Sequence, residues 1–224
     1  MPASIANLGR GFTNTYLVRD AGAVLIDPGV AWSARALVRK LTRIESDLKG
    51  LRLILATHGH FDHIGAAASL HEATGAPVAI HRGDAEWLAT GQWEWPRGVT
   101  RWGKILRTIL APFMHRLGAV RPLQPDLVIE DEGLDLVPYG VPGKVVHTPG
   151  HSPGSISVLL ESGEAFVGDL AMNGLPLTLK PAFGIFAHQP ELVPASWRRL
   201  LDLGARTIYP AHGRPFPAEA LHLA

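Results

Sequence analysis

The stretch LATHGHFDHIG at residues 55–65 places three histidines and one aspartate within six positions, directly after an apolar run. Side chains two positions apart project to the same side of an extended backbone, so His58 and His60 can hold one ion. Asp62 and His63 follow after a turn, which lets them face a second position. Imidazole and carboxylate ligands together suit Zn²⁺, Fe²⁺ or Mn²⁺. The stretch therefore predicts a metal site, with a histidine-rich surface loop as the alternative.

The composition is that of a folded chain with little net charge. The 224 residues are 46% hydrophobic and 18% charged, which favours a globule that buries a substantial core. The formal net charge of +1 produces no global field that would attract nucleic acid, so we expect no such partner. Cysteine is absent, which excludes disulfides and thiolate catalysis.

The N-terminal stretch MPASIANLGRGFTNTYLV lacks a basic start followed by a continuous apolar segment, so we expect no signal peptide. The sequence contains no run of about 18 apolar residues, so we expect no transmembrane helix. On these grounds the sequence predicts a cytoplasmic protein.

Strands and helices are expected to alternate along the chain. The first half predicts a hairpin at 16–18 and 24–26, a helix over about 32–48, and a buried strand at 51–56. After the histidine-rich turn, a helix at 64–73 should end near Gly75, and PVAIH (77–81) should return as a strand. The strands expected in the second half are 127–129, 134–137, 144–147, 156–160, 165–167 and 207–209, with a helix at 193–203. This alternation indicates the α/β class.

Four further motifs follow the same order along the chain as those of one known family. They are LIDPG (25–29), TPGHSPGS (148–155), FVGDLA (166–171) and YPAHG (209–213). Together with THGHFDHIG, they resemble the signature of the metallo-β-lactamase superfamily and span most of the chain. The resemblance implies one domain over 1–224, folded as a four-layer αββα sandwich with the site at one edge between two sheets.

The resemblance also implies a role for each motif residue. One metal ion would be held by His58, His60 and His151. The second ion would be held by Asp62, His63 and His212, and Asp169 would bridge the two. Asp27 would fix ligand orientation through hydrogen bonds. Asp62 would lie beside both a metal ion and the nucleophile, so it could also move a proton as a catalytic residue.

The activity implied is hydrolysis with two divalent metal ions, most often zinc, with iron or manganese as alternatives. A hydroxide between the two ions would attack an electrophilic carbonyl or phosphorus. A bridging aspartate at Asp169 resembles the glyoxalase II and lactonase branches of the superfamily. Two features depart from these branches: only twelve residues follow His212, and LAMN (170–173) has no tyrosine of the lactonase type. We therefore expect a small ester, lactone or thioester as substrate.

Three alternatives remain open at this point. A persulfide dioxygenase shares the histidine signature but binds a single iron, held mainly by His58, His151 and Asp169. A phosphodiesterase would use the same two metal ions. A metal-binding module without catalysis is the third alternative.

A segment at about 84–124 is expected to form a helical insertion. Four of the chain's six tryptophans lie in it, and residues 96–122 contain six basic side chains and no acidic one. A helix over 102–117 would have one broad apolar face and one basic face. The insertion could pack against the body, cap the metal cleft over a lipophilic substrate, or place 101–117 on a membrane surface. The predicted substrate contacts are Trp102, Ile109, Phe113, Phe183 and Phe186.

Overall fold

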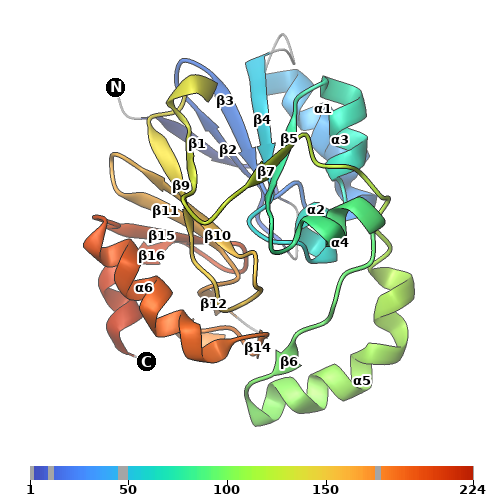
Figure 1. Ribbon diagram of the computed structural model, residues 1–224, viewed down its shortest axis with the longest axis vertical. Helices are drawn as coiled ribbons and strands as arrows, with labels where there is room; N and C mark the ends of the chain where they lie inside the picture. Colours follow the sequence, from blue (N-terminus) through green and yellow to red (C-terminus); the bar gives the residue numbers. More distant parts are fainter. Residues whose placement is uncertain (1–2, 10–12, 45–49, 175–177, 224) are drawn as a thin grey trace.

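The computed structural model describes residues 3–9, 13–44, 50–174 and 178–223. Two six-stranded sheets lie face to face, and helices cover the outer face of each sheet (Figure 1). These four layers confirm the predicted αββα sandwich.

The first sheet has the order β1-β2-β3-β4-β5-β7. Its strands β1, β2 and β3 pair antiparallel, whereas β3, β4, β5 and β7 run parallel. The bounds are β1 Ser4–Asn7, β2 Tyr16–Arg19, β3 Ala23–Ile26, β4 Leu51–Leu55, β5 Val78–His81 and β7 Leu127–Ile129. The predicted hairpin and the predicted buried strand at 51–56 are both confirmed, because β4 is buried at every residue except Arg52.

The second sheet has the order β16-β15-β11-β10-β9-β8. Only β11 and β15 pair parallel; the other neighbours are antiparallel. The bounds are β8 Leu134–Asp135, β9 Gly143–His147, β10 Ile156–Leu160, β11 Glu164–Gly168, β15 Thr207–Pro210 and β16 Phe216–Pro217. The strand predicted at 134–137 ends early, because the chain turns into the 3-10 helix η3 (Val137–Tyr139).

Helices on the first sheet differ from the predicted ones at two points. The predicted helix over 32–48 is α1 (Ala34–Ile44), preceded by the 3-10 helix η1 (Ala31–Ser33); residues 45–48 fall outside the described part. The helix predicted over 64–73 is α3 (Ala67–Thr74), which begins later than predicted, because Ile64 belongs to the short preceding helix α2 (Phe61–Ile64). The break between α2 and α3 occurs because the Ala66 amide donates to the carbonyl of Gly29 rather than within the helix.

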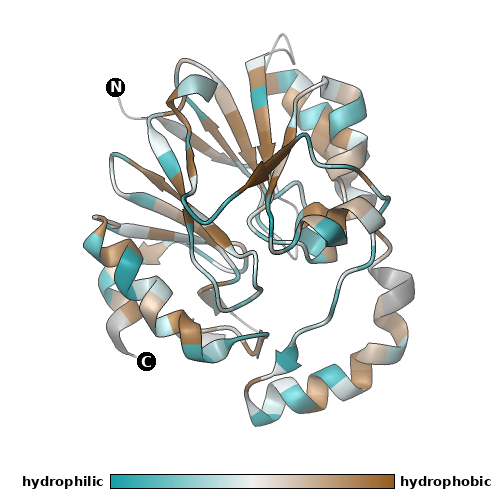
Figure 2. Ribbon diagram, in the orientation of Figure 1, coloured by the Kyte–Doolittle hydropathy of each residue, from teal (hydrophilic) through white to brown (hydrophobic). Residues whose placement is uncertain are grey.

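Three apolar layers hold the sandwich together. Side chains alternate along β2 and β3, so Leu17 and Leu25 face α1 and α3 while Val18 and Val24 face the second sheet. The second sheet packs its outer face against α6 (Val193–Asp202), where Trp197 is the largest buried side chain. Each fully buried side chain of Leu or Phe size stabilises the fold by about 1.5–3 kcal/mol. The central strands β3, β4 and β5, covered on both faces, are mostly apolar (Figure 2).

The segment between β5 and β7 forms α4 (Ala85–Thr90), β6 (Arg97–Gly98) and α5 (Arg101–Leu117). Helix α5 begins where the Thr100 hydroxyl accepts a hydrogen bond from the Gly103 amide at 2.9 Å, and it continues through Pro112. It lies at the margin of the molecule, away from the four layers (Figure 1). Strand β6 pairs with β14 (Phe186–Ala187), which connects the segment to the loop that follows β11.

The remaining elements are short. They are β12 (Met172–Gly174), β13 (Thr178–Ala182), and the 3-10 helices η4 (Pro190–Leu192) and η5 (Ala218–Leu223). Among the described residues, no helix combines the length and the apolar character that crossing a membrane requires.

Candidate metal centre

All seven predicted ligands meet at one edge of the sandwich, where strands of both sheets end. His58, His60, Asp62 and His63 follow β4, whereas His151, Asp169 and His212 follow β9, β11 and β15. Within each of two groups the ligand atoms lie within 4.8 Å of one another: His58, His60 and His151 form the first triad, and Asp62, His63 and His212 form the second triad. Helix α2 begins at Phe61, so His58 and His60 lie before it, whereas Asp62 and His63 lie within it. The chain therefore turns between the two pairs of side chains, as the sequence predicts.

Asp169 lies between the two triads. Its Oδ2 is 3.6 Å from His151 Nε2 of the first triad. Its Oδ1 is 3.4 Å from His63 Nε2 and 3.2 Å from His212 Nε2 of the second triad. One carboxylate with an oxygen toward each triad is the arrangement that a bridging ligand requires.

The donor atoms of the first triad fit a metal ion. The Nε2 atom of His58 is fully buried and has no hydrogen-bond partner among the described residues. His60 Nδ1 and His151 Nε2 face each other at 2.9 Å. Buried ring nitrogens that converge without other partners are costly unless an ion or a proton satisfies them. The residues present therefore fit a divalent metal ion of the kind that binds imidazole.

Hydrogen bonds on the far side of two ligand rings fix which nitrogen faces the site. His151 Nδ1 lies 3.0 Å from the carbonyl of Phe186, which can only accept, so Nδ1 carries the proton and Nε2 is free for an ion. His58 Nδ1 lies 3.1 Å from the Thr57 hydroxyl. Such partners orient metal-binding histidines and raise their basicity.

Asp27 contacts the second triad through a charge interaction with the far nitrogen of His63. Its Oδ1 accepts a hydrogen bond from the Thr57 amide at 2.8 Å, and its Oδ2 lies 3.0 Å from His63 Nδ1. This contact leaves His63 Nε2 directed at Asp62 and Asp169. The structure thus places Asp27 behind the ligands, where the sequence predicts it.

Burial and neighbouring charges shift the pKa values of several of these side chains, often in opposite directions. Burial, and then the neighbouring His63, lower the pKa of His58 well below its usual range. Burial raises the pKa of Asp169, but His212 and His63 overcome this effect and hold it well below the usual value. Burial lowers the pKa of His63, yet Asp62, Asp27 and Asp169 together raise it well above 6.5. Burial lowers the pKa of His60 and His151 as well, so the first triad is neutral. The carboxylates raise the pKa of His63 and of His212, so they stabilise positive charge in the second triad, which a bound cation would supply in place of the protons.

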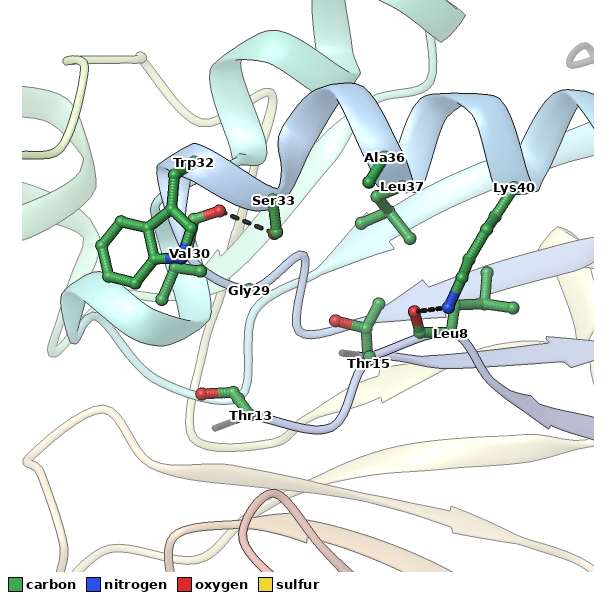
Figure 3. A pocket seen from close by; sticks show the side chains of 11 residues that line it. Leu8, Thr13, Thr15, Gly29, Val30, Trp32, Ser33, Ala36, Leu37 and Lys40 are labelled. Atoms are coloured by element: carbon green, nitrogen blue, oxygen red, sulfur yellow. Dashed lines mark hydrogen bonds between the residues drawn. The ribbon is translucent and has the colours of Figure 1, made fainter. Parts of the chain in front are cut away.

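Thr13 is a site residue that the sequence analysis missed. Its hydroxyl donates a hydrogen bond to Asp62 Oδ2 at 3.0 Å, although 49 positions separate the two residues. Thr13 also lines a small cavity of about 50 Å³ between the loop that follows β1 and helix α1 (Figure 3). Two polar side chains of its lining are paired: Lys40 donates to the Leu8 carbonyl and Ser33 to the Val30 carbonyl. This cavity has room for a few water molecules at most.

A larger, mostly apolar cavity of about 310 Å³ opens at the ligands. His60, Asp62, His151, Asp169 and His212 form its polar end. The remainder is lined by Phe61, Trp93, Trp95, Pro96, Leu106, Leu110, Met114, Met172, Ile185 and Phe186. In the part of the lining that the structure describes, no residue is a lysine or an arginine. Leu106, Leu110 and Met114 recur every four residues on α5, which is the signal by which the sequence could have identified them.

Of the five predicted substrate contacts, only Phe186 is among the residues that line the cavity. Phe183 is half-buried and packs against the core beneath α6. Trp102, Ile109 and Phe113 lie on the outward side of α5, where they are 50%, 58% and 59% exposed. The structure thus brings Phe186 to the site but does not bring the three α5 residues to it.

A further group of potential ligands, His81, Asp131 and His147, is better described as a hydrogen-bonded cluster. The Gly83 amide donates to His81 Nδ1 at 3.1 Å, so the ring proton is on Nε2. That proton is directed at Asp131 Oδ1, which lies 3.1 Å away and also accepts a hydrogen bond from Arg82. A metal ion beside Asp131 would need a lone pair on His81 Nε2. In this tautomer Nε2 carries the proton, and the lone pair lies on Nδ1, where it accepts the hydrogen bond from Gly83.

The fold and the ligand set are those of a metal-dependent hydrolase class, and comparison with known proteins gives the family. The family model described as "Metallo-beta-lactamase superfamily" matches residues 8–212. The chain belongs to this superfamily.

Relatives support the same assignment. "Probable metallo-hydrolase YflN" of Bacillus subtilis (strain 168) is 28% identical over 211 residues, covering 88% of this chain and 77% of the relative. "Hydroxyacylglutathione hydrolase GloC" of Haemophilus influenzae is 30% identical, covering 69% and 64%. "Acyl-coenzyme A thioesterase MBLAC2" of Homo sapiens is 30% identical, covering 93% and 75%. These similarities and the ligand set make the chain a metal-dependent hydrolase.

A solved structure shows the same fold. The structure described as "TTHA1623 in a di-iron-bound form" superposes with a TM-score of 0.66 at 30% sequence identity. The superposition covers 97% of this chain and 96% of that chain.

Proposed function

We propose that the protein is a dinuclear metal-dependent hydrolase that cleaves a small lipophilic ester, lactone or thioester. The observation that carries the proposal is the pair of ligand triads joined by Asp169 at the end of an apolar cavity. Relatives named for thioester substrates, a hydroxyacylglutathione hydrolase and an acyl-coenzyme A thioesterase, support the reaction type. The di-iron form of TTHA1623 supports two ions, and zinc, iron or manganese would suit these ligands.

Two divalent ions bound there would supply a water of lowered pKa and an electrophile for the substrate carbonyl. The protein itself contributes groups that hold Asp62 in place and a carboxylate that can transfer a proton. Thr13 holds Asp62 Oδ2 by a hydrogen bond, so this carboxylate stays fixed at the cavity wall. We assign Asp62 the transfer of the proton from the attacking water toward the leaving group. The apolar walls exclude bulk water and strengthen each of these polar contacts.

The cavity lining selects the substrate. Trp93, Trp95 and Phe186 form aromatic walls, with the centroids of the Trp95 and Phe186 rings 5.6 Å apart. Because no lysine or arginine is found among the described residues of its lining, a carboxylated acyl group would lose its hydration beside these walls without gaining a cationic partner from them. An alkyl or aryl acyl group would instead gain from burial.

We propose that the segment at 84–124 is the cap of this site. The cap and the sandwich would together form a single domain. The cap supplies Trp93, Trp95 and the inner side of α5 to the cavity. The pairing of β6 with β14 ties the cap to Phe186, whose own carbonyl orients His151. Contact of Trp102, Ile109 and Phe113 with substrate stays a prediction that would require α5 to rotate, and contact of 101–117 with a membrane also stays a prediction.

The test combines metal analysis with a substrate screen. We expect about two zinc or iron ions per chain and hydrolysis of medium-chain acyl thioesters, aryl esters or lactones. The variant Asp169→Ala should lose metal and lower kcat/KM by roughly 100-fold or more, since bridging charge stabilisation amounts to several kcal/mol. Full activity in this variant would refute the bridging role. One iron per chain with oxygen consumption on a persulfide would instead establish the dioxygenase.

A further inference from the structure

Asp84 is a buried carboxylate that touches the first triad's loops without being a ligand. It lies between β5 and α4, is 1% exposed, and belongs to none of the groups that could hold a metal ion. We propose that Asp84 is a positioning residue that sets the spacing of the first triad, and hence the affinity of one of the two metal ions. The inference rests on the proposed dinuclear site.

Both oxygens of Asp84 accept hydrogen bonds from the loops that carry the ligands. Oδ2 accepts from the Gly59 amide at 2.8 Å and from the Ser152 hydroxyl at 2.6 Å. Oδ1 accepts from the Gly154 amide at 2.8 Å. Gly59 lies between His58 and His60, and Ser152 follows His151. One carboxylate therefore joins the two segments that supply the whole first triad.

Close packing reinforces these bonds. A Cβ atom added to Gly154 would lie 2.7 Å from Asp84 Oδ1, and one added to Gly59 would lie 3.0 Å from Asp84 Cβ. Neither loop could approach the carboxylate with a larger residue. From the next turn, Trp87 stacks on the ring of His60, with the centroids 5.6 Å apart and the planes 13° apart. The β5–α4 turn thus fixes both the backbone and one ring of the first triad.

The second triad is held by other groups. Asp27 orients His63, and Thr13 donates to Asp62. Among the described residues, no hydrogen bond of Asp84 reaches Asp62, His63 or His212. A change at Asp84 should therefore weaken one ion selectively, and this selectivity separates a positioning role from a general effect on folding.

The substitution Asp84→Asn tests this with little change in shape. An amide has one oxygen, so either orientation places its NH₂ group against a backbone N–H, that of Gly59 or that of Gly154. One buried donor then loses its acceptor and the two loops move apart. Loss of a partner of this kind weakens metal binding about 10-fold to 100-fold.

The matched control is Asp126→Asn. Asp126 Oδ2 accepts a hydrogen bond from the Val78 amide at 2.8 Å, so this carboxylate also holds a backbone amide, but at the start of β5, the end away from the metal centre. Zinc affinity would be measured by competition with a chromophoric chelator, and Co²⁺ absorption would report the geometry of each site. Circular dichroism would confirm that every variant is folded.

We expect Asp84→Asn to bind one ion about 10-fold to 100-fold more weakly, with an altered Co²⁺ spectrum, and to bind the other ion normally. Asp126→Asn should bind both ions as the wild type does. If Asp84→Asn does not fold, Ser152→Ala, which removes one of the three hydrogen bonds, should give a smaller loss at the same ion.

Equal weakening of both ions, or unchanged affinity for both, would overturn the positioning role of Asp84 and leave the hydrolase proposal intact. A wild-type chain that binds no metal ion would overturn the proposed function itself, and the Asp84 inference with it.

Discussion

Asp27 adopts a left-handed backbone conformation, with φ at 55°, although it is not a glycine. No other non-glycine residue in the described part of the chain has positive φ. This conformation costs about 1–2 kcal/mol for most residues, although aspartate and asparagine adopt it more readily because they can bond locally. Here it directs the carboxylate at Thr57 and at the far nitrogen of His63. The strain therefore serves the metal centre.

Exchanging Asp27 for asparagine should disturb the tautomer of His63 rather than the backbone. An amide NH₂ in place of Oδ2 would require His63 Nδ1 to accept, so the ring proton would move to Nε2, the ligand atom. We expect metal affinity to fall about 10-fold to 100-fold with the fold retained. Metal titration with circular dichroism checks this expectation, and an unchanged affinity would show that Asp27 does not set the tautomer.

His81 should make the protein less stable in acid. Burial and the stacked His147 ring lower the pKa of His81 to about 4, whereas an unfolded histidine has a pKa of about 6.5. Between these values the unfolded chain takes up a proton that the folded chain does not. The free energy of unfolding should therefore fall from pH 6.5 toward pH 4, by up to about 1.4 kcal/mol per pH unit from this group.

Urea unfolding of the metal-free protein at several pH values would measure this slope. The variant His81→Asn should show a shallower decline, because it lacks the group that protonates in the unfolded chain. Equal slopes in the two proteins would mean that another group accounts for the sensitivity to acid.

Helix α5 has two apolar sides with different surroundings. Leu106 is half-buried and lines the cavity, whereas the adjacent Ile105 points outward and is 53% exposed. Leu106→Ala should therefore lower kcat/KM for a medium-chain acyl thioester roughly tenfold, because about 1.4 kcal/mol of apolar contact is lost. Ile105→Ala is the matched control and should leave the same kinetics unchanged. A loss in both variants would mean that α5 acts by its stability, and no loss in either would remove α5 from the substrate site.

The sequence predicts elements well where periodicity is local, and poorly where contacts are distant. Strands β4, β9, β10, β11 and β15 are apolar runs with clear turns, and all were found near their predicted positions. The paired strands β6 and β14 were not predicted, because each has two residues and depends on a partner nearly ninety positions away. Helix α3 began later than expected because a carbonyl from another segment, that of Gly29, accepts the Ala66 amide.

The same distinction applies to the site. The ligands are recognisable because five motifs carry reactive residue types at fixed spacing. Thr13 and Asp84 carry no such signal, since their roles arise from hydrogen bonds to residues 49 and 68 positions away. The side of α5 that is exposed also carries no sequence signal, because it depends on the position of the helix at the margin of the molecule (Figure 1). Spacing can predict an amphipathic helix but not which part of its apolar face meets the cavity.

The candidate metal centre lies where the two halves of the sandwich meet. The first sheet supplies His58, His60, Asp62 and His63, and the second sheet supplies the other three ligands. Ions bound here would tie the sheets together at one edge, while the apolar layer between them provides the remaining contact. Because the unfolded chain does not hold the ligands together, binding energy becomes folding energy.

Removal of metal should therefore lower the thermal stability of the whole chain. An ion present at about 1,000 times its Kd stabilises the folded state by about 4 kcal/mol, which corresponds to roughly 8–16 °C in Tm for a chain of this size. Calorimetry before and after dialysis against a chelator measures the difference, and added zinc should restore it. Asp169→Ala is the control, since a site without its bridging ligand should respond much less. Equal Tm values with and without metal would show that the apolar layer alone holds the two sheets together.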